Sequence, residues 1–123
     1  MEKLNFYVYL AAPYSDIEES VRQFRFEKIN EISAKLMREG WTIYSPISHS
    51  HPIAVNHSLP TGWEFWGKMD RPFIKNCLFL IILMLPGWKQ SHGVGEEIKL
   101  AKEFNKPIVY LTPTGEWHYQ RVR

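Results

Sequence analysis

Four short segments of the chain are rich in apolar, β-branched and aromatic side chains and are bounded by turn-forming residues. This composition predicts strands at residues 5–11, 41–45, 77–85 and 106–112. The segment 77–85 is apolar almost throughout, without alternation. That pattern is typical of a strand buried on both faces of a parallel sheet.

The segments between these strands carry apolar residues at a different spacing. Residues 15–40 and 91–105 show the three- and four-residue spacing of amphipathic helices, and part of residues 62–76 is also predicted to be helical. Residues 46–62 contain three prolines and three histidines and are expected to form a long loop. Long loops in compact domains often carry function.

Strands that alternate with helices indicate an α/β domain. We expect residues 1–123 to form a single doubly wound domain of the Rossmann or flavodoxin-like type, with a parallel sheet of four to five strands and helices on both faces. Ligands of such sheets bind beyond the carboxyl ends of the strands. The segments expected there are residues 11–15, 46–60 and 86–95.

Composition narrows the class of partner. The net charge of +2 is too small to indicate a nucleic-acid polymer as the partner, because a basic stripe would then be expected. The apolar run at residues 77–85 is too short to cross a bilayer, and the first residues lack a signal peptide's apolar core. A single cysteine, Cys77, is typical of a reducing compartment. We therefore expect a cytoplasmic protein that binds no membrane.

Two adjacent glutamates follow the glycines of "SHGVGEEIKLA". On a helix, Val94, Ile98 and Ala101 share a stripe that should face the sheet. Glu97 lies at the edge of this stripe, whereas Glu96 points away toward solvent. A partly buried carboxylate is often retained for function; the alternative is that Glu97 only complements the helix dipole.

Small residues surround the expected start of this helix. Ser91 can cap the helix, and Gly93 and Gly95 allow backbone N–H groups to approach an anion. The histidines of the segment 46–62, with no nearby thiolate or carboxylate, have a spacing that is poor for zinc. We expect no metal and no cofactor.

Four blocks of sequence together resemble one family. "YLAAPYS", "SPISHSHPIA", "GWEFWGKMDR" and "LPGWKQSHGVGEEI" are similar to segments of the nucleoside 2-deoxyribosyltransferase-like superfamily. They are closest to a subfamily of small bacterial and phage proteins that is classed as a domain of unknown function. The string "SxGVGxE" is also shared with 2′-deoxynucleoside 5′-monophosphate N-glycosidases. The resemblance extends over nearly the whole chain.

The resemblance implies roles for individual residues. Glu97 corresponds to the nucleophile, Tyr9 to the tyrosine that lies against the sugar and the nucleophile, and Asp70 to an acid that assists at the base or sugar. Ser91 stands where the transferases carry Asp and the glycosidases carry a phosphate-binding Ser. Together with Gly93 and Gly95, it favours a 5′-monophosphate substrate, because an Asp would repel the phosphate. Tyr14, His51 and Trp66 are candidates for contacts to the base.

The expected activity is therefore hydrolysis of the N-glycosidic bond of (2′-deoxy)nucleoside 5′-monophosphates through a glycosyl-enzyme intermediate on Glu97. One alternative is a nucleoside 2-deoxyribosyltransferase that acts on free nucleosides. Another is a non-catalytic module that binds or senses nucleotides. The superfamily completes its sites across subunits, which implies a homodimer or a higher homo-oligomer.

Overall fold

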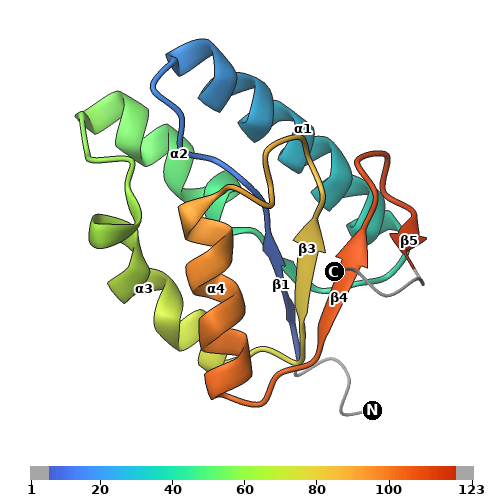
Figure 1. The fold of residues 1–123 in the computed structure, drawn as a ribbon. Helices are drawn as coiled ribbons and strands as arrows, with labels where there is room; N and C mark the ends of the chain where they lie inside the picture. The colour runs from blue at the N-terminus through green and yellow to red at the C-terminus, as the bar shows by residue number, and fades with distance from the viewer. Residues whose placement is uncertain (1–5, 119–123) are drawn as a thin grey trace.

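The computed structural model describes residues 6–118 and has five strands and four helices within them (Figure 1). In chain order these elements are β1 (Val8–Ala11), α1 (Glu19–Arg38), β2 (Ile43–Tyr44), α2 (Pro46–His57), α3 (Trp63–Asn76), β3 (Leu80–Leu83), α4 (His92–Glu103), β4 (Ile108–Leu111) and β5 (Trp117–His118). The expected α/β fold is confirmed.

The strands form one sheet in the order β2-β1-β3-β4-β5. Strands β2, β1, β3 and β4 are parallel, and β5 joins the edge of β4 in the antiparallel direction. The order is that of flavodoxin-like doubly wound sheets. Such sheets bind ligands at the carboxyl ends of the strands, near the point where successive connections diverge.

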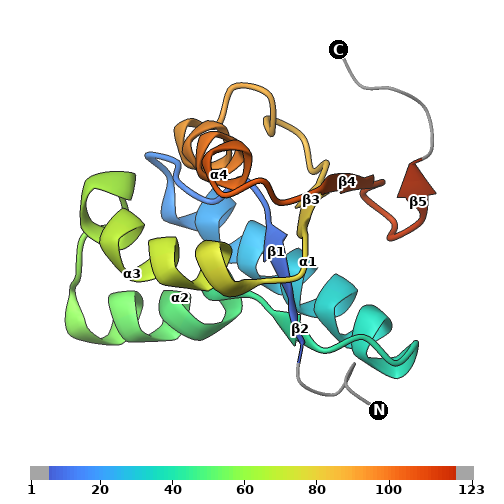
Figure 2. The same cartoon turned by 90° about the horizontal axis from the view of Figure 1, so that it is seen from below.

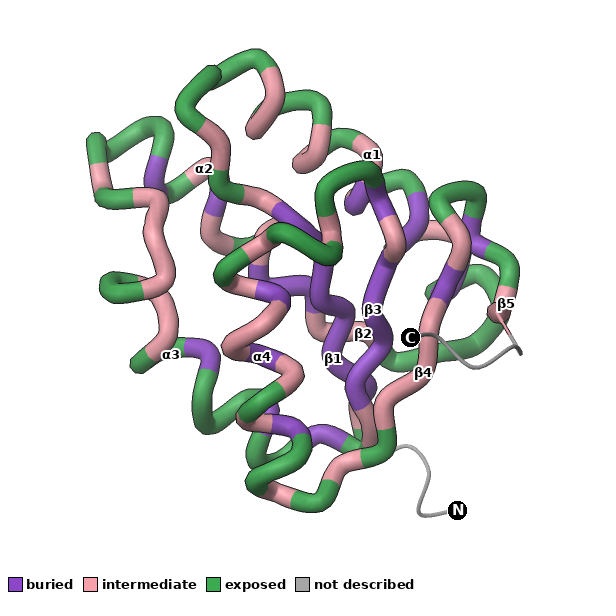
Figure 3. Tube along the Cα trace, viewed as in Figure 1, coloured by how far each residue is buried: buried purple, intermediate pink, exposed green. Residues whose placement is uncertain are grey.

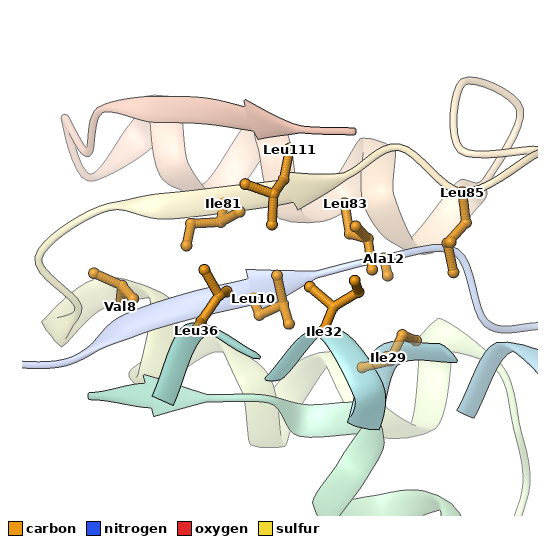
Figure 4. Packing of buried hydrophobic residues seen from close by; sticks show 10 residues of the cluster. All are labelled: Val8, Leu10, Ala12, Ile29, Ile32, Leu36, Ile81, Leu83, Leu85 and Leu111. Atoms are coloured by element: carbon orange, nitrogen blue, oxygen red, sulfur yellow. The ribbon is translucent and has the colours of Figure 1, made fainter. Parts of the chain in front are cut away.

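Helices cover both faces of the sheet (Figure 2). On one face, α1 packs Ile29, Ile32 and Leu36 against side chains of β1, β3 and β4, and Figure 4 shows this apolar cluster from close by. On the other face, Ile74 of α3 and Val94 and Ala101 of α4 pack against the alternate side chains of the same strands. Strands β1 and β3 are buried along their whole length (Figure 3), as their apolar composition predicts.

The expected loop at residues 46–62 is wrong for most of its length, because Pro46–His57 forms α2. Pro46 lies at the helix start, where a missing N–H group costs nothing, and Ser58 ends the helix with φ +57°. Burial of His51 and Ala54 against neighbouring elements offsets the cost of Pro52 inside the helix. Tertiary packing thus overrides the local signal of the prolines.

A turn and a short fifth strand follow β4 at the end of the described chain. Residues 113–116 form a turn in which Gly115 has φ +90°, and Trp117–His118 then pairs with β4. No helix within residues 6–118 has both the length and the apolar character needed to cross a membrane.

Candidate active site

A cavity opens at the carboxyl end of β1, between the loop that follows this strand and the helices α2, α3 and α4. In Figure 1 these segments surround the upper end of β1. The open volume is about 600 Å³, counted out to solvent. The residues that line it are Ala12, Tyr14, Ser15, Pro46, Ile47, Ser50, His51, Ala54, Thr61, Gly62, Trp63, Trp66, Asp70, Ser91, Gly93 and Glu97.

Glu97 and Tyr9 form the innermost contact of this site. The Tyr9 hydroxyl donates a hydrogen bond of 2.6 Å to Glu97 Oε2. Tyr9 is fully buried on β1 and does not line the cavity, whereas Glu97 is 6% exposed and does. Tyr9 therefore acts on the cavity through Glu97 and does not contact its contents.

Asp70 of α3 supplies a second buried carboxyl group to the same cavity and is 7% exposed. Burial raises the pKa of Asp70 to about 7, and the Tyr9 hydroxyl opposes this effect. Burial also raises the pKa of Glu97 to about 8; Tyr9 opposes this rise, and the charge of Asp70 adds to it. The Tyr9 proton points at Glu97 and stabilises a negative charge there, although burial still leaves Glu97 with a higher pKa than Asp70.

The two adjacent glutamates face different ways, as helical geometry predicts. Glu97 is buried against the sheet side of α4, whereas Glu96 is half-buried in a groove between α3 and α4 and pairs with Lys99 Nζ at 3.0 Å. Glu96 does not line the cavity. It is therefore a close control position for any substitution of Glu97.

The amino end of α4 points its backbone toward the cavity. Ser91 is the N-cap, and its Oγ accepts a hydrogen bond from the Val94 N–H group at 3.2 Å. The N–H groups of His92 and Gly93 belong to the first turn, where a helix has no internal acceptor for them. Ser91 Oγ and these two N–H groups could thus bind an anion.

Gly95 does not share this position. Its N–H group donates to Ser91 O at 3.1 Å within the helix, and Gly95 does not line the cavity. The expectation of a free N–H group at Gly95 is therefore not met, because the helix has already begun four residues earlier.

The three residues expected near a base all line the cavity, but their polar atoms already have partners. The Tyr14 hydroxyl lies 2.5 Å from His51 Nδ1, and His51 Nε2 lies 2.9 Å from Gln23 Oε1. Trp66 Nε1 donates to Pro60 O at 2.7 Å, which leaves the ring itself for contact. Within the part of the chain that the structure describes, no three His, Cys, Asp or Glu side chains gather as metal ligands.

The sequence did not predict that one side of the cavity is formed by a helix, α2. Ile47, Ser50 and Ala54 line the cavity because Pro46–His57 is a helix and not a loop. Their four- and three-residue spacing is a helical signal, which the prolines concealed. Gln23 was missed as well, since nothing in the sequence of α1 links it to His51.

Comparisons with known proteins identify a family and supply no activity. A search of the curated proteins finds no match to this chain. A family model described as "Domain of unknown function (DUF1937)" matches residues 6–112, which include every residue of the cavity. The chain therefore belongs to the DUF1937 family.

Proposed function

We propose that this protein is an N-glycosidase that hydrolyses (2′-deoxy)nucleoside 5′-monophosphates to a free base and a sugar phosphate. The observation that carries the proposal is the 2.6 Å hydrogen bond from Tyr9 to Glu97 inside a cavity that also holds Asp70. Two buried carboxyl groups with raised pKa values, one oriented by a hydroxyl donor, are typical of a nucleophile and an acid. The resemblance to the nucleoside 2-deoxyribosyltransferase-like superfamily assigns the same two residues.

In the first step, a Glu97 carboxylate oxygen bonds to C1′ of the sugar while the bond from C1′ to the base nitrogen breaks. The base departs with the electron pair of that bond and takes a proton from Asp70. Glu97 must be ionised for this attack, and the Tyr9 hydrogen bond favours the ionised form. Asp70 must be protonated, which its pKa of about 7 allows near neutral pH.

In the second step, water attacks C1′ and gives its proton to the Asp70 carboxylate. The bond between C1′ and Glu97 breaks, and the carboxylate of Glu97 is restored. The products are the free base and the sugar 5′-phosphate. A transferase would differ only in that a second base replaces this water.

The amino end of α4 supports a phosphate on the substrate. Ser91 Oγ and the N–H groups of His92 and Gly93 are donors next to the positive end of the helix dipole. No carboxylate stands at position 91 to repel the phosphate. The buried free thiol of Cys77 is compatible with a cytoplasmic enzyme.

The test is to incubate the protein with a panel of nucleoside and 2′-deoxynucleoside monophosphates and with the free nucleosides, with and without an acceptor base. Release of free base from a monophosphate without an acceptor is expected. Exchange that requires an acceptor and accepts free nucleosides would instead identify a transferase. Binding without any turnover would identify a nucleotide-binding module and overturn the proposal.

Two adjacent substitutions make the assignment of Glu97 specific. Glu97→Gln keeps the size of the side chain but removes the nucleophile, so turnover should fall at least about a thousandfold, as for other nucleophiles that act within a catalytic unit. Glu96→Gln makes the same change one residue away, outside the cavity lining. It should keep the rate of the unmodified protein within about twofold, since exposed ion pairs contribute little.

A further inference from the structure

A chain of hydrogen-bonded side chains runs from the surface of α1 to the cavity. Gln23 Nε2 donates to Glu27 Oε2 at 2.9 Å, and Gln23 Oε1 lies 2.9 Å from His51 Nε2. His51 Nδ1 lies 2.5 Å from the Tyr14 hydroxyl, and both residues line the cavity. Two residues of α1, one of α2 and one of the loop after β1 thus form a single series.

The donor and acceptor capacities of these side chains decide which atom of each pair carries the proton. The Glu27 carboxylate only accepts, so it attracts the amide NH2 of Gln23 and turns the amide oxygen toward His51. His51 Nε2 must then carry the ring proton, and in a neutral ring Nδ1 has none. The Tyr14 hydroxyl therefore donates its proton to His51 Nδ1.

His51 meets the condition of a neutral ring. It is 4% exposed and stacks on Phe26 with ring centroids 4.3 Å apart. Burial lowers the pKa of His51, and the nearby Arg22 guanidinium lowers it further against a smaller opposite effect of Glu19. Arg22 also acts on the Tyr14 hydroxyl, where it lowers a pKa that burial raises. Since a guanidinium only donates, Arg22 beside the Tyr14 oxygen agrees with the same direction.

The direction decides what Tyr14 offers to a ligand. Because its proton points at His51, the Tyr14 oxygen has only lone pairs left for the cavity. A ligand group beside it must then be a hydrogen-bond donor. A carbonyl oxygen in that place would face another oxygen and lose its own hydrogen bond to water.

The contact with His51 places the Tyr14 hydroxyl beside α2, where Ile47 and Ala54 line the cavity one helical turn to either side of His51. The cavity has a polar end formed by Asp70, Glu97 and Ser91. The remaining walls are mainly apolar or aromatic, with Ile47, Ala54, Trp63 and Trp66 among them. A flat ring is best accommodated between such walls, and a sugar phosphate is best accommodated by the polar end.

We propose that Tyr14 is a specificity-determining residue that selects nucleobases with an exocyclic amino group over bases with an oxo group at the same position, and that His51 is the positioning residue that fixes the direction of the Tyr14 hydroxyl. This inference rests on the proposed function for the identity of the ligand. The hydrogen-bond direction does not depend on it.

The first experiment compares matched substrates that carry either an amino or an oxo group at one ring position; the oxo bases also carry a proton on the adjacent ring nitrogen. These are 2′-deoxyadenosine against 2′-deoxyinosine monophosphate, and 2′-deoxycytidine against 2′-deoxyuridine monophosphate. The amino-to-oxo ratio of kcat/KM should be about tenfold larger for the unmodified protein than for Tyr14→Phe, the effect of one hydrogen bond. Dividing the two ratios cancels the different reactivity of the bases themselves.

A second test variant and a control variant accompany Tyr14→Phe. His51→Phe keeps an aromatic ring for stacking but removes the acceptor, so the ratio should fall as it does in Tyr14→Phe. Tyr110→Phe removes a hydroxyl from β4, outside the cavity lining, and should keep the ratio of the unmodified protein. An unchanged ratio in Tyr14→Phe, or a preference for oxo bases, would overturn the selection of amino groups.

The second experiment needs no turnover. The ring nitrogen chemical shifts of ¹⁵N-labelled histidine distinguish the two neutral tautomers, and the His51 signals are assigned by their loss in His51→Phe. The proton is expected on Nε2; a proton on Nδ1 would reverse the series and overturn the inference. If no nucleotide is bound or hydrolysed, the proposed function fails together with the choice of ligand, while the tautomer still decides the direction.

Discussion

The Tyr9 hydroxyl donates a hydrogen bond of 2.6 Å to Glu97 Oε2 and joins residues that are 88 positions apart in the chain. Tyr9 is 0% exposed, so its hydroxyl lies behind the carboxylate and away from solvent. Among the side chains of the described residues, only Tyr9 donates a hydrogen bond to the Glu97 carboxylate. In the proposed mechanism, the ionisation of Glu97 therefore depends on Tyr9, a residue that does not line the cavity.

Tyr9→Phe should slow turnover by about tenfold to hundredfold, the loss expected for a charge-assisted hydrogen bond of about 1.5–3 kcal/mol. Without the donor, the pKa of Glu97 rises further, so the loss should be in kcat and should shrink as the pH is raised. Tyr7→Phe is the control, because it also deletes a hydrogen bond of a tyrosine hydroxyl, to Phe73 O at 2.7 Å, but this bond is exposed and lies away from the cavity. Equal losses in both variants would contradict the role of Tyr9.

The raised pKa values of the two carboxyl groups make the stability of the fold depend on pH. The pKa of Glu97 is about 8 in the folded protein against an ordinary value of 4.5, and that of Asp70 is about 7 against 3.8. Between the ordinary and the raised values, the folded state binds more protons than the unfolded state. The free energy of unfolding should therefore fall as the pH rises from about 4 to about 8.

Glu97→Gln tests this effect, because the amide cannot lose a proton and is never a buried charge. The melting temperature of the variant should exceed that of the unmodified protein at pH 8 to 9, and the difference should vanish near pH 4. Glu96→Gln should follow the unmodified protein at every pH. Parallel curves for the unmodified protein and Glu97→Gln would show that Glu97 ionises without cost.

The same pair of carboxyl groups should shape the pH dependence of activity. The proposed mechanism needs one ionised and one protonated group, so kcat/KM should be bell-shaped. Because the groups are coupled, the two limbs belong to the pair, with apparent values near 7 and 8. Asp70→Asn should lower the rate and remove one limb, whereas a bell that survives this change would exclude Asp70 as the acid.

Ser91 is the N-cap of α4 and a proposed phosphate ligand, and one substitution can separate these two roles. Asp is as good an N-cap as Ser, so Ser91→Asp should keep the stability of α4 while it adds a negative charge beside the proposed phosphate site. We expect KM for monophosphates to rise about tenfold or more, with little change for free nucleosides. Ser91→Ala should instead cost about 1 kcal/mol of stability through the lost cap.

The control variant is Glu96→Ala. Glu96 belongs to the same helix but does not line the cavity. If Ser91→Asp changes monophosphate use no more than Glu96→Ala does, the amino end of α4 does not bind the phosphate. If both substrates lose equally, the added charge disturbs the carboxyl pair and not a phosphate site.

The sequence predicts those features that depend on local periodicity. The alternation of strands and helices, the burial of β1 and β3, and the different directions of Glu96 and Glu97 all follow from spacing along the chain. The helix α2 does not, because Pro52 opposes it locally and packing of His51 and Ala54 outweighs this effect. The helix α1 begins at Glu19, with Glu18 as its N-cap, and not at residue 15 as the spacing predicts. Asp16 instead forms the preceding turn, in which its Oδ1 accepts a hydrogen bond from the Glu18 N–H group.

Contacts between distant segments form the part of the site that the sequence does not reveal. Periodicity places Glu97 on the sheet side of its helix, but it does not identify Tyr9 as the donor. Nor does it link Gln23 to His51, since their contact depends on how α1 and α2 pack. Each of these pairs is set by the tertiary fold and becomes visible only there.

Arg25 connects the two loops that flank the cavity mouth. Its guanidinium donates to Ser15 O at 3.0 Å and Tyr14 O at 3.3 Å after β1, and to Pro86 O at 3.4 Å after β3. Gly87 allows this approach, because its φ is +92° and an added Cβ would lie 2.9 Å from Arg25 Nη2. The loop that carries Tyr14 is therefore tied to the loop that leads to Ser91.

Arg25→Lys should loosen this connection, since an ammonium group cannot span the two loops as the planar guanidinium does. We expect KM to rise several-fold with a smaller change in kcat, because the loops contact the ligand while Glu97, Asp70 and Tyr9 lie on regular elements. Gly87→Ala should have a similar effect and destabilise the fold by about 1 kcal/mol or more through the strained φ. In the double variant the two effects on KM should not add, because both act on one contact; full additivity would show that Arg25 and Gly87 act independently.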